Sequence, residues 1–117
     1  MNQTTLNRGL RAEQLAKEYL TQQGLKPITQ NYRCRLGEID LIMSDITHLI
    51  FVEVRMRLNP NCGGPLDSIS LTKQQRLIKT AIHYLQKNSL YDKTPCRFDV
   101  IGIDQKKTFT WIKNAIF

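Results

Sequence analysis

The sequence predicts an α/β fold in which a mixed β-sheet is flanked by helices. Three observations predict it: helical periodicity at 5–23 and 70–87, short β-rich runs elsewhere, and the order in which the two alternate. The expected order of elements is α-β-β-β-α-β-β. A chain of 117 residues is expected to form one domain, residues 1–117, with a single core.

Both expected helices are amphipathic. The helix at 5–23 has a broad apolar arc, and Gly24 follows where a C-cap is expected. The arc consists of Leu6, Leu10, Ala12, Leu15, Ala16, Tyr19 and Leu20. The helix at 70–87 has an apolar stripe of Leu77, Ile78, Ala81, Ile82 and Leu85. Either Ser70 or Thr72 is able to cap it, and Thr72 with Gln75 fits a capping box.

The β-rich runs predict a sheet with one central strand that carries charge. They lie at 28–35, 38–43, 49–57, 97–103 and 108–112. The first is polar, so we expect it to be exposed. In the third, Ile50, Val52, Val54 and Met56 share an apolar face, while the opposite face changes from apolar to charged at Glu53. A flexible loop is expected at 59–65, where Gly and Pro cluster.

The charge balance favours a polyanionic partner. The formal net charge is +7 and the isoelectric point is about 9.6, which favours nucleic acid first and an anionic membrane surface second. No apolar run approaches the roughly 18 residues that cross a bilayer, and no signal-peptide pattern begins the sequence. We therefore expect a cytoplasmic protein without a membrane partner. The three cysteines lie far apart and not at zinc spacing from either histidine, so reduced thiols are expected.

Asp40 and Glu53 are the strongest candidates for a functional site. A turn centred near residue 46 or 47 places Asp40 opposite Glu53, or one residue off, with Cβ atoms roughly 4.5–5.5 Å apart. Two carboxylates this close repel each other unless a cation lies between them or one is protonated. Hard oxygen ligands at that separation suit Mg²⁺ or Mn²⁺. Ordinary salt bridges to neighbouring arginines are the alternative, but Glu53 interrupts an apolar run, where burying an uncompensated charge is costly.

Arg55 and Glu13 are the next candidates for this site. Arg55 lies two residues beyond Glu53 on the same strand face and is able to reach a phosphate oxygen. Glu13 falls within the apolar arc of the first helix. There it either points a third metal-binding carboxylate towards the sheet or forms an exposed pair with Lys17. The sequence favours neither interpretation.

Two other carboxylates have mainly structural interpretations. Glu38 shares a strand face with Asp40 and is able to assist it, although a salt bridge to Arg33 or Arg35 fits at least as well. Asp99 is interpreted as structural, tying the final strand to a neighbouring arginine.

Basic residues near these carboxylates are expected to contact nucleic-acid phosphates. The candidates are Arg57, Lys73, Arg76, Arg33 and Arg35. Lys73 stands near the start of the second helix and could supply an ammonium group to the site. A solvated lysine at the helix end is the favoured interpretation of Lys73. For the basic residues along one side of the second helix, a solvated helix face fits any one of them equally well; they are Lys73, Arg76, Lys79, His83 and Lys87.

Several motifs, taken in order, resemble the YraN family. They are GEIDLI at 37–42, FVEVRMR at 51–57, Lys73 with Arg76 and Leu77, Ala81 with Tyr84 and Leu85, and RFDVI at 97–101. That family consists of small uncharacterised bacterial proteins that look like members of the PD-(D/E)xK nuclease superfamily and are close in shape to Holliday-junction resolvases. The resemblance covers nearly the whole chain. It implies a restriction-endonuclease-like core with the order α-β-β-β-α-β.

The resemblance also implies roles for particular residues. Asp40 and Glu53 match the metal-binding carboxylates, and Glu13 matches the acid on the first helix of resolvase-like members. Position 55 matches the superfamily's lysine, but here it is arginine, which stays protonated and cannot act as a base. The implied function is a Mg²⁺- or Mn²⁺-dependent endonuclease acting on DNA, branched DNA included. The alternative is a non-catalytic nucleic-acid-binding module with a degenerate nuclease site. Resolvase-like activity would favour a symmetric homodimer, because two strands must be cut together.

Overall fold

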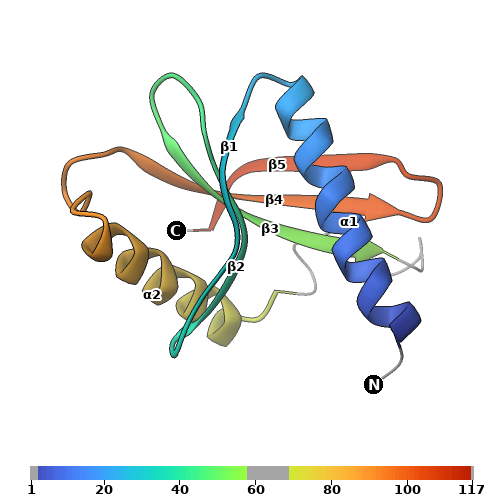
Figure 1. Ribbon diagram of the computed structural model, residues 1–117, viewed down its shortest axis with the longest axis horizontal. Coiled ribbons are helices and arrows are strands. Elements are labelled where there is room, and N and C mark those ends of the chain that lie inside the picture. Colours follow the sequence, from blue (N-terminus) through green and yellow to red (C-terminus); the bar gives the residue numbers. More distant parts are fainter. Residues whose placement is uncertain (1–2, 58–68, 117) are drawn as a thin grey trace.

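The described part of the protein folds as one five-stranded mixed sheet with two helices, in the order that the sequence predicts (Figure 1). The computed structural model describes residues 3–57 and 69–116. The loop expected at 59–65 lies outside these residues, as do the side chains of residues 3–8 and 57. The elements are α1 (Gln3–Gln22), β1 (Lys26–Cys34), β2 (Gly37–Ser44), β3 (Leu49–Arg57), α2 (Leu71–Lys87), β4 (Cys96–Asp104) and β5 (Phe109–Ile116).

The strands lie in the order β1-β2-β3-β4-β5, which makes β3 the central strand as expected. Neighbouring strands are antiparallel except β3 and β4, which are parallel. A parallel pair needs a crossover connection, and α2 lies within it. The sequence between β3 and β4 therefore has to return along the sheet, which brings the start of α2 next to the charged end of β3.

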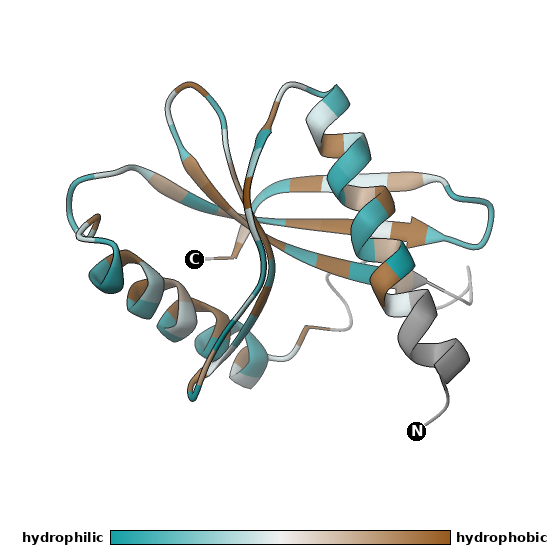
Figure 2. Ribbon diagram, viewed as in Figure 1, coloured by the Kyte–Doolittle hydropathy of each residue, from teal (hydrophilic) through white to brown (hydrophobic). Residues whose placement is uncertain are grey.

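The core has two clusters because the helices cover opposite faces of the sheet. Successive residues of β3 point to opposite faces, so Val52 packs with α1 whereas Phe51 packs with α2. Brown segments in Figure 2 run along the central strands, and brown alternates with teal along both helices. Among the described residues, no helix combines the length and apolar character that crossing a bilayer requires.

Among its described side chains, helix α1 buries three residues of its expected apolar arc and leaves Leu10 exposed. Ala12, Ala16 and Leu20 are buried, but Leu10 is 48% exposed. Gly24 ends the helix with a φ of +104°, which confirms the expected C-cap glycine.

Helix α2 begins after Ser70, whose side chain accepts a 3.1 Å hydrogen bond from the Lys73 backbone N–H. The Thr72–Gln75 capping box is therefore wrong: both residues lie inside the helix that Ser70 caps. Leu77, Ala81 and Leu85 are buried as expected, together with Thr80 and Tyr84. Thr80 fits in the core because its hydroxyl donates to the Arg76 carbonyl oxygen at 2.7 Å.

Strand β5 runs to Ile116, four residues beyond the end expected from the sequence. The extra length includes a register shift between β4 and β5 near Asp99, and Asn114 has a positive φ of 54°. The Asn114 N–H donates to the Asp99 carboxylate at 2.9 Å. The Asp99 side chain on β4 thus stabilises the irregular backbone of β5 at Asn114, where the sequence has no strand pattern.

Candidate active site

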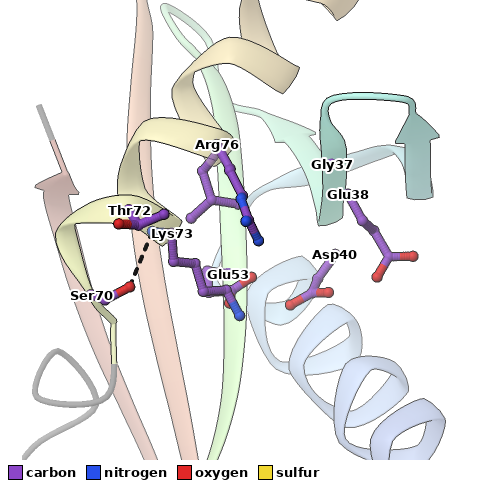
Figure 3. A pocket seen from close by; sticks show the side chains of 9 residues that line it. Gly37, Glu38, Asp40, Glu53, Ser70, Thr72, Lys73 and Arg76 are labelled. Carbon is purple, nitrogen blue, oxygen red and sulfur yellow. Dashed lines mark hydrogen bonds and ion pairs between the residues drawn. The ribbon is translucent and has the colours of Figure 1, made fainter.

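A cavity of about 420 Å³ lies between β2, β3 and the start of α2. Figure 3 shows Asp40 and Glu53 reaching it from adjacent strands, with Lys73 extending from α2 over Glu53. Its lining residues are Gly37, Glu38, Asp40, Glu53, Ser70, Thr72, Lys73, Arg76 and Leu77. The cavity therefore collects acidic residues from the sheet and basic residues from the helix.

Asp40 and Glu53 are brought together by the pairing of β2 with β3. The ladder pairs Leu41 with Val52, and continuing that register by one residue places Asp40 opposite Glu53, as the sequence predicts. The paired residues end at Leu41 and Val52, and the Asp40 carboxylate accepts the Val54 N–H at 2.9 Å. The Asp40 side chain thus satisfies the Val54 N–H at the point where the backbone pairing of β2 and β3 ends.

The surroundings of Asp40 favour its protonated form. Burial raises the pKa of Asp40, and the charge of Glu53 and a hydrogen bond to that residue raise it further, to about 9. The Val54 N–H lowers the pKa of Asp40, but this effect is smaller than burial and the Glu53 charge. Without a cation, the pair therefore retains a proton at neutral pH, so two full negative charges do not face each other.

Glu53 is buried, and two cationic side chains contact one of its oxygens. The side chain is 5% exposed, with the Lys73 Nζ 2.8 Å and the Arg55 guanidinium 3.3 Å from its Oε2 atom. These contacts compensate for the burial of a charge inside an apolar strand. The interpretation of Lys73 as a solvated helix-end residue is wrong, because its ammonium group forms an ion pair with Glu53 inside the cavity.

Glu13 points a carboxylate towards this region from α1. Burial raises its pKa, and the negative charges of Glu38 and Glu53 raise it as well, whereas hydrogen bonds to Asn31 and Asp40 lower it. Its Oε1 atom is buried and has no hydrogen-bond partner within the described part of the chain. The exposed pair with Lys17 is therefore the poorer of the two interpretations.

Asn31 is a neighbour of the site that the sequence analysis missed. It lies between residues of β1 that pair with Leu41 and Ile39, which places it opposite Asp40. Its φ of 54° is left-handed, a conformation that asparagine adopts more readily than most residues. The sequence shows only an asparagine within a polar edge strand, and this does not indicate that Asn31 lies near Glu13 of α1.

The donor set fits a hard divalent cation, although the described residues form no complete protein cage for one. Glu38, Asp40 and Glu53 line the cavity, and a cation would satisfy their oxygens. Glu13 is not among the lining residues, although one of its buried oxygens has no donor in the described part of the chain. No three His, Cys, Asp or Glu side chains among the described residues come together as a metal site. Mg²⁺ commonly binds one or two carboxylates and completes its shell with water and phosphate. Asp40 and Glu53 are the two that face each other.

The basic candidates occupy different places. Arg76 lines the cavity. Arg33 forms an ion pair with Glu38, which is one of the two salt bridges expected for Glu38 from the sequence. Arg35 is exposed near the β1–β2 turn. Arg57 ends β3, and its side chain is outside the described part of the structure.

Asp99 is structural, as interpreted from the sequence. It is fully buried and accepts hydrogen bonds from the Arg97 guanidinium at 3.0 Å, the Trp111 indole at 2.9 Å and the Asn114 backbone N–H. Arg97 also contacts Asp45 at 3.4 Å. This network joins β4 to β5, and none of its residues lines the cavity.

The fold and the cavity together define a mixed α/β protein with two facing carboxylates and a lysine beside them. Residues 12–103 match the model of the uncharacterised protein family UPF0102, so the chain belongs to that family, and the resemblance to YraN proteins is confirmed. A UPF0102 protein from Legionella pneumophila is 54% identical over 112 residues, which cover 95% of each chain. One from Coxiella burnetii is 54% identical over 108 residues, 92% of this chain and 90% of its own.

A solved structure is also similar, but weakly. The structure of Pyrococcus furiosus SfsA in complex with Ca²⁺ aligns with 94% of this chain and 63% of its own, with 16% identity and a TM-score of 0.35. A likeness at this level carries no conclusion about the function of the present chain.

Proposed function

We propose that the protein is a metal-dependent endonuclease, or a nuclease-like protein, that acts on DNA, branched DNA included. The observation that carries this proposal is the pair formed by Asp40 and Glu53, which face each other beside Lys73 in one cavity. A carboxylate in a cleft whose pKa is raised by burial and by the charge of a second carboxylate is typical of catalytic sites. The order of elements and the YraN resemblance support the same class of protein.

Each residue has a role that its position allows. Asp40 and Glu53 would hold Mg²⁺ or Mn²⁺, which neutralises phosphate charge and lowers the pKa of water when bound. Glu13 orients a water molecule with the carboxylate oxygen that has no protein donor in the described residues. Arg55 donates to a non-bridging phosphate oxygen, since arginine stays charged at all relevant pH values.

The charge distribution supports a nucleic-acid substrate. The chain has a net charge of +7, and α2 contains four Lys or Arg residues and no Asp or Glu. Because Arg76 of this helix also lines the cavity, a strand lying at the carboxylates would meet cations on the same side. Binding should weaken with salt by about 0.9 log units per tenfold change in salt for each phosphate neutralised on a duplex.

Cleavage of a panel of branched and linear DNAs tests the proposal. The purified protein is incubated with each DNA in Mg²⁺, in Mn²⁺ and in chelator, beside the Asp40→Asn and Asp92→Asn variants. Asp92 is an exposed residue with a φ of 64°, which asparagine tolerates, so it is a matched control. We expect cation-dependent cleavage that Asp40→Asn abolishes and Asp92→Asn retains, with DNA binding intact in both. Equal cleavage by Asp40→Asn would refute the assignment.

A non-catalytic nucleic-acid-binding module is the second candidate. The observation in its favour is Arg55, which contacts Glu53 at 3.3 Å and cannot serve as a base. Under this alternative, DNA binding falls steeply with salt but is the same in divalent cation and in chelator. Filter binding at low salt under both conditions separates the two functions, because a binding module has no need of the cation.

A further inference from the structure

Lys73 reaches Glu53 from helix α2, whereas Asp40 and Glu53 lie on strands β2 and β3. The Ser70 hydroxyl accepts the backbone N–H of Lys73, so the start of α2 is fixed independently of the lysine side chain. From there the side chain extends into the cavity, where its Nζ lies 2.8 Å from Glu53 Oε2 (Figure 3). The helix thus delivers an ammonium group to the carboxylate.

Arg55 contacts the same oxygen, but the two cations differ in mobility and shape. Arg55 lies two residues from Glu53 on β3 and is 24% exposed, whereas the Lys73 side chain is 43% exposed. Lysine is a compact point charge on a flexible four-carbon stem, and arginine is a planar fork. Lys73 is therefore the contact that is able to leave Glu53 while its helix stays in place.

A divalent cation at Glu53 would displace this ammonium group. The cation and the Lys73 Nζ would carry like charges and compete for one carboxylate that is 5% exposed. The cavity continues from Lys73 to Ser70, Thr72 and Arg76, so the displaced ammonium group would remain on the wall where an anionic ligand fits.

We propose, on the basis of the function proposed above, that Lys73 is a mobile ammonium group shared between Glu53 and a nucleic-acid phosphate. Without a divalent cation it neutralises Glu53. When a cation occupies the carboxylates, it transfers to a phosphate oxygen of a strand in the cavity. Lys73 thereby couples cation binding to strand binding.

Two binding measurements test this coupling without relying on cleavage. Mn²⁺ affinity is measured by calorimetry for the wild type, Lys73→Met, Lys73→Arg and Lys79→Met, the last being an exposed lysine of the same helix. Lys73→Met retains the backbone N–H that Ser70 caps, and circular dichroism checks that it folds. We expect Mn²⁺ to bind about fivefold more tightly to Lys73→Met, because partly exposed ion pairs contribute modestly. The Lys73→Arg and Lys79→Met variants should bind Mn²⁺ within about twofold of the wild type.

The second measurement is the salt dependence of binding to a labelled DNA duplex, in a fixed concentration of Ca²⁺ and in chelator. In Ca²⁺, the log–log slope of the wild type should be steeper than that of Lys73→Met by about one phosphate, roughly 0.9. In chelator the two slopes should coincide, because Lys73 remains with Glu53.

Three outcomes would overturn the coupling, and they differ in what else they affect. Unchanged Mn²⁺ affinity in Lys73→Met, with normal binding by the wild type, would reject the role of Lys73 alone. Equal differences in slope with and without Ca²⁺ would show that Lys73 contacts phosphate independently of the cation. Absence of Mn²⁺ binding to the wild type would remove the cation site, and the proposed function with it.

Discussion

The Asp40→Asn substitution separates the charge of this buried carboxyl group from its shape. Asparagine has nearly the same volume, and its carbonyl oxygen is able to accept the Val54 N–H that Asp40 accepts at 2.9 Å. The change therefore removes the group that binds the proton, while the Val54 N–H keeps a hydrogen-bond acceptor. Its effect on stability should depend on pH.

The pKa of Asp40 fixes the sign and the range of this effect. It rises from 3.8 to about 9 on folding, through burial and the Glu53 charge, so the folded protein keeps a proton that the unfolded chain releases. Stability from this group is fully present below the unfolded pKa and is lost as pH rises through the folded pKa. A difference of one bound proton changes the free energy of unfolding by about 1.4 kcal/mol per pH unit. Between about pH 5 and pH 8, the free energy of unfolding of the wild type should therefore fall by up to about 4 kcal/mol relative to that of Asp40→Asn.

Urea denaturation in chelator at several pH values measures this difference. We expect the Asp40→Asn protein to become progressively more stable than wild type as pH rises, with the gap smallest in acid. The Asp92→Asn variant should follow the wild-type curve, because Asp92 is exposed. Parallel curves for wild type and Asp40→Asn would refute the conclusion that the folded protein holds a proton at this carboxylate pair.

Two further substitutions test the packing around the site, at the Asp99 hydrogen-bond network and at the contact of Gly37 with α2. Asp99→Ala removes the buried acceptor of Arg97 and Trp111 and should cost about 3–5 kcal/mol of unfolding free energy; a loss below about 1 kcal/mol in urea denaturation would contradict this. Gly37→Ala places a Cβ atom 2.9 Å from the Thr80 hydroxyl at a φ of +154° and should cost about 1–3 kcal/mol. Gly9→Ala, with nothing within 4 Å, is its control and should not destabilise; similar losses in both would argue against the close approach of the β1–β2 turn to α2.

The central pair of the site was predictable from sequence because it depends on local geometry. A short turn between two strands fixes which residues face each other, so the register that places Asp40 opposite Glu53 follows from the positions of the two strands. The apolar surroundings of Glu53 indicated burial, and the structure confirms it. The order of helices and strands was also predictable, because the periodicity of each element is a local feature of the sequence.

The contacts made by Lys73 and Asn31 were not predictable, because they depend on packing between distant elements. Lys73 is twenty positions beyond Glu53 and reaches it only because α2 is the crossover of a parallel pair. Asn31 lies near Glu13 because β1 pairs with β2 while α1 packs across the sheet. Helical periodicity identified α2, but it does not distinguish a solvated lysine from one whose ammonium group pairs with a buried carboxylate.

Calorimetric titration of Mn²⁺ tests most directly whether Asp40 and Glu53 hold a divalent cation. The wild type, Asp40→Asn, Glu53→Gln and Asp92→Asn proteins are compared at one pH and salt concentration. We expect one site in the wild type and in Asp92→Asn, and at least about tenfold weaker binding in the other two, since loss of an outer-shell partner alone costs about 10–100-fold. Equal affinity in all four proteins, or no binding by the wild type, would contradict the assignment of these carboxylates as a metal site.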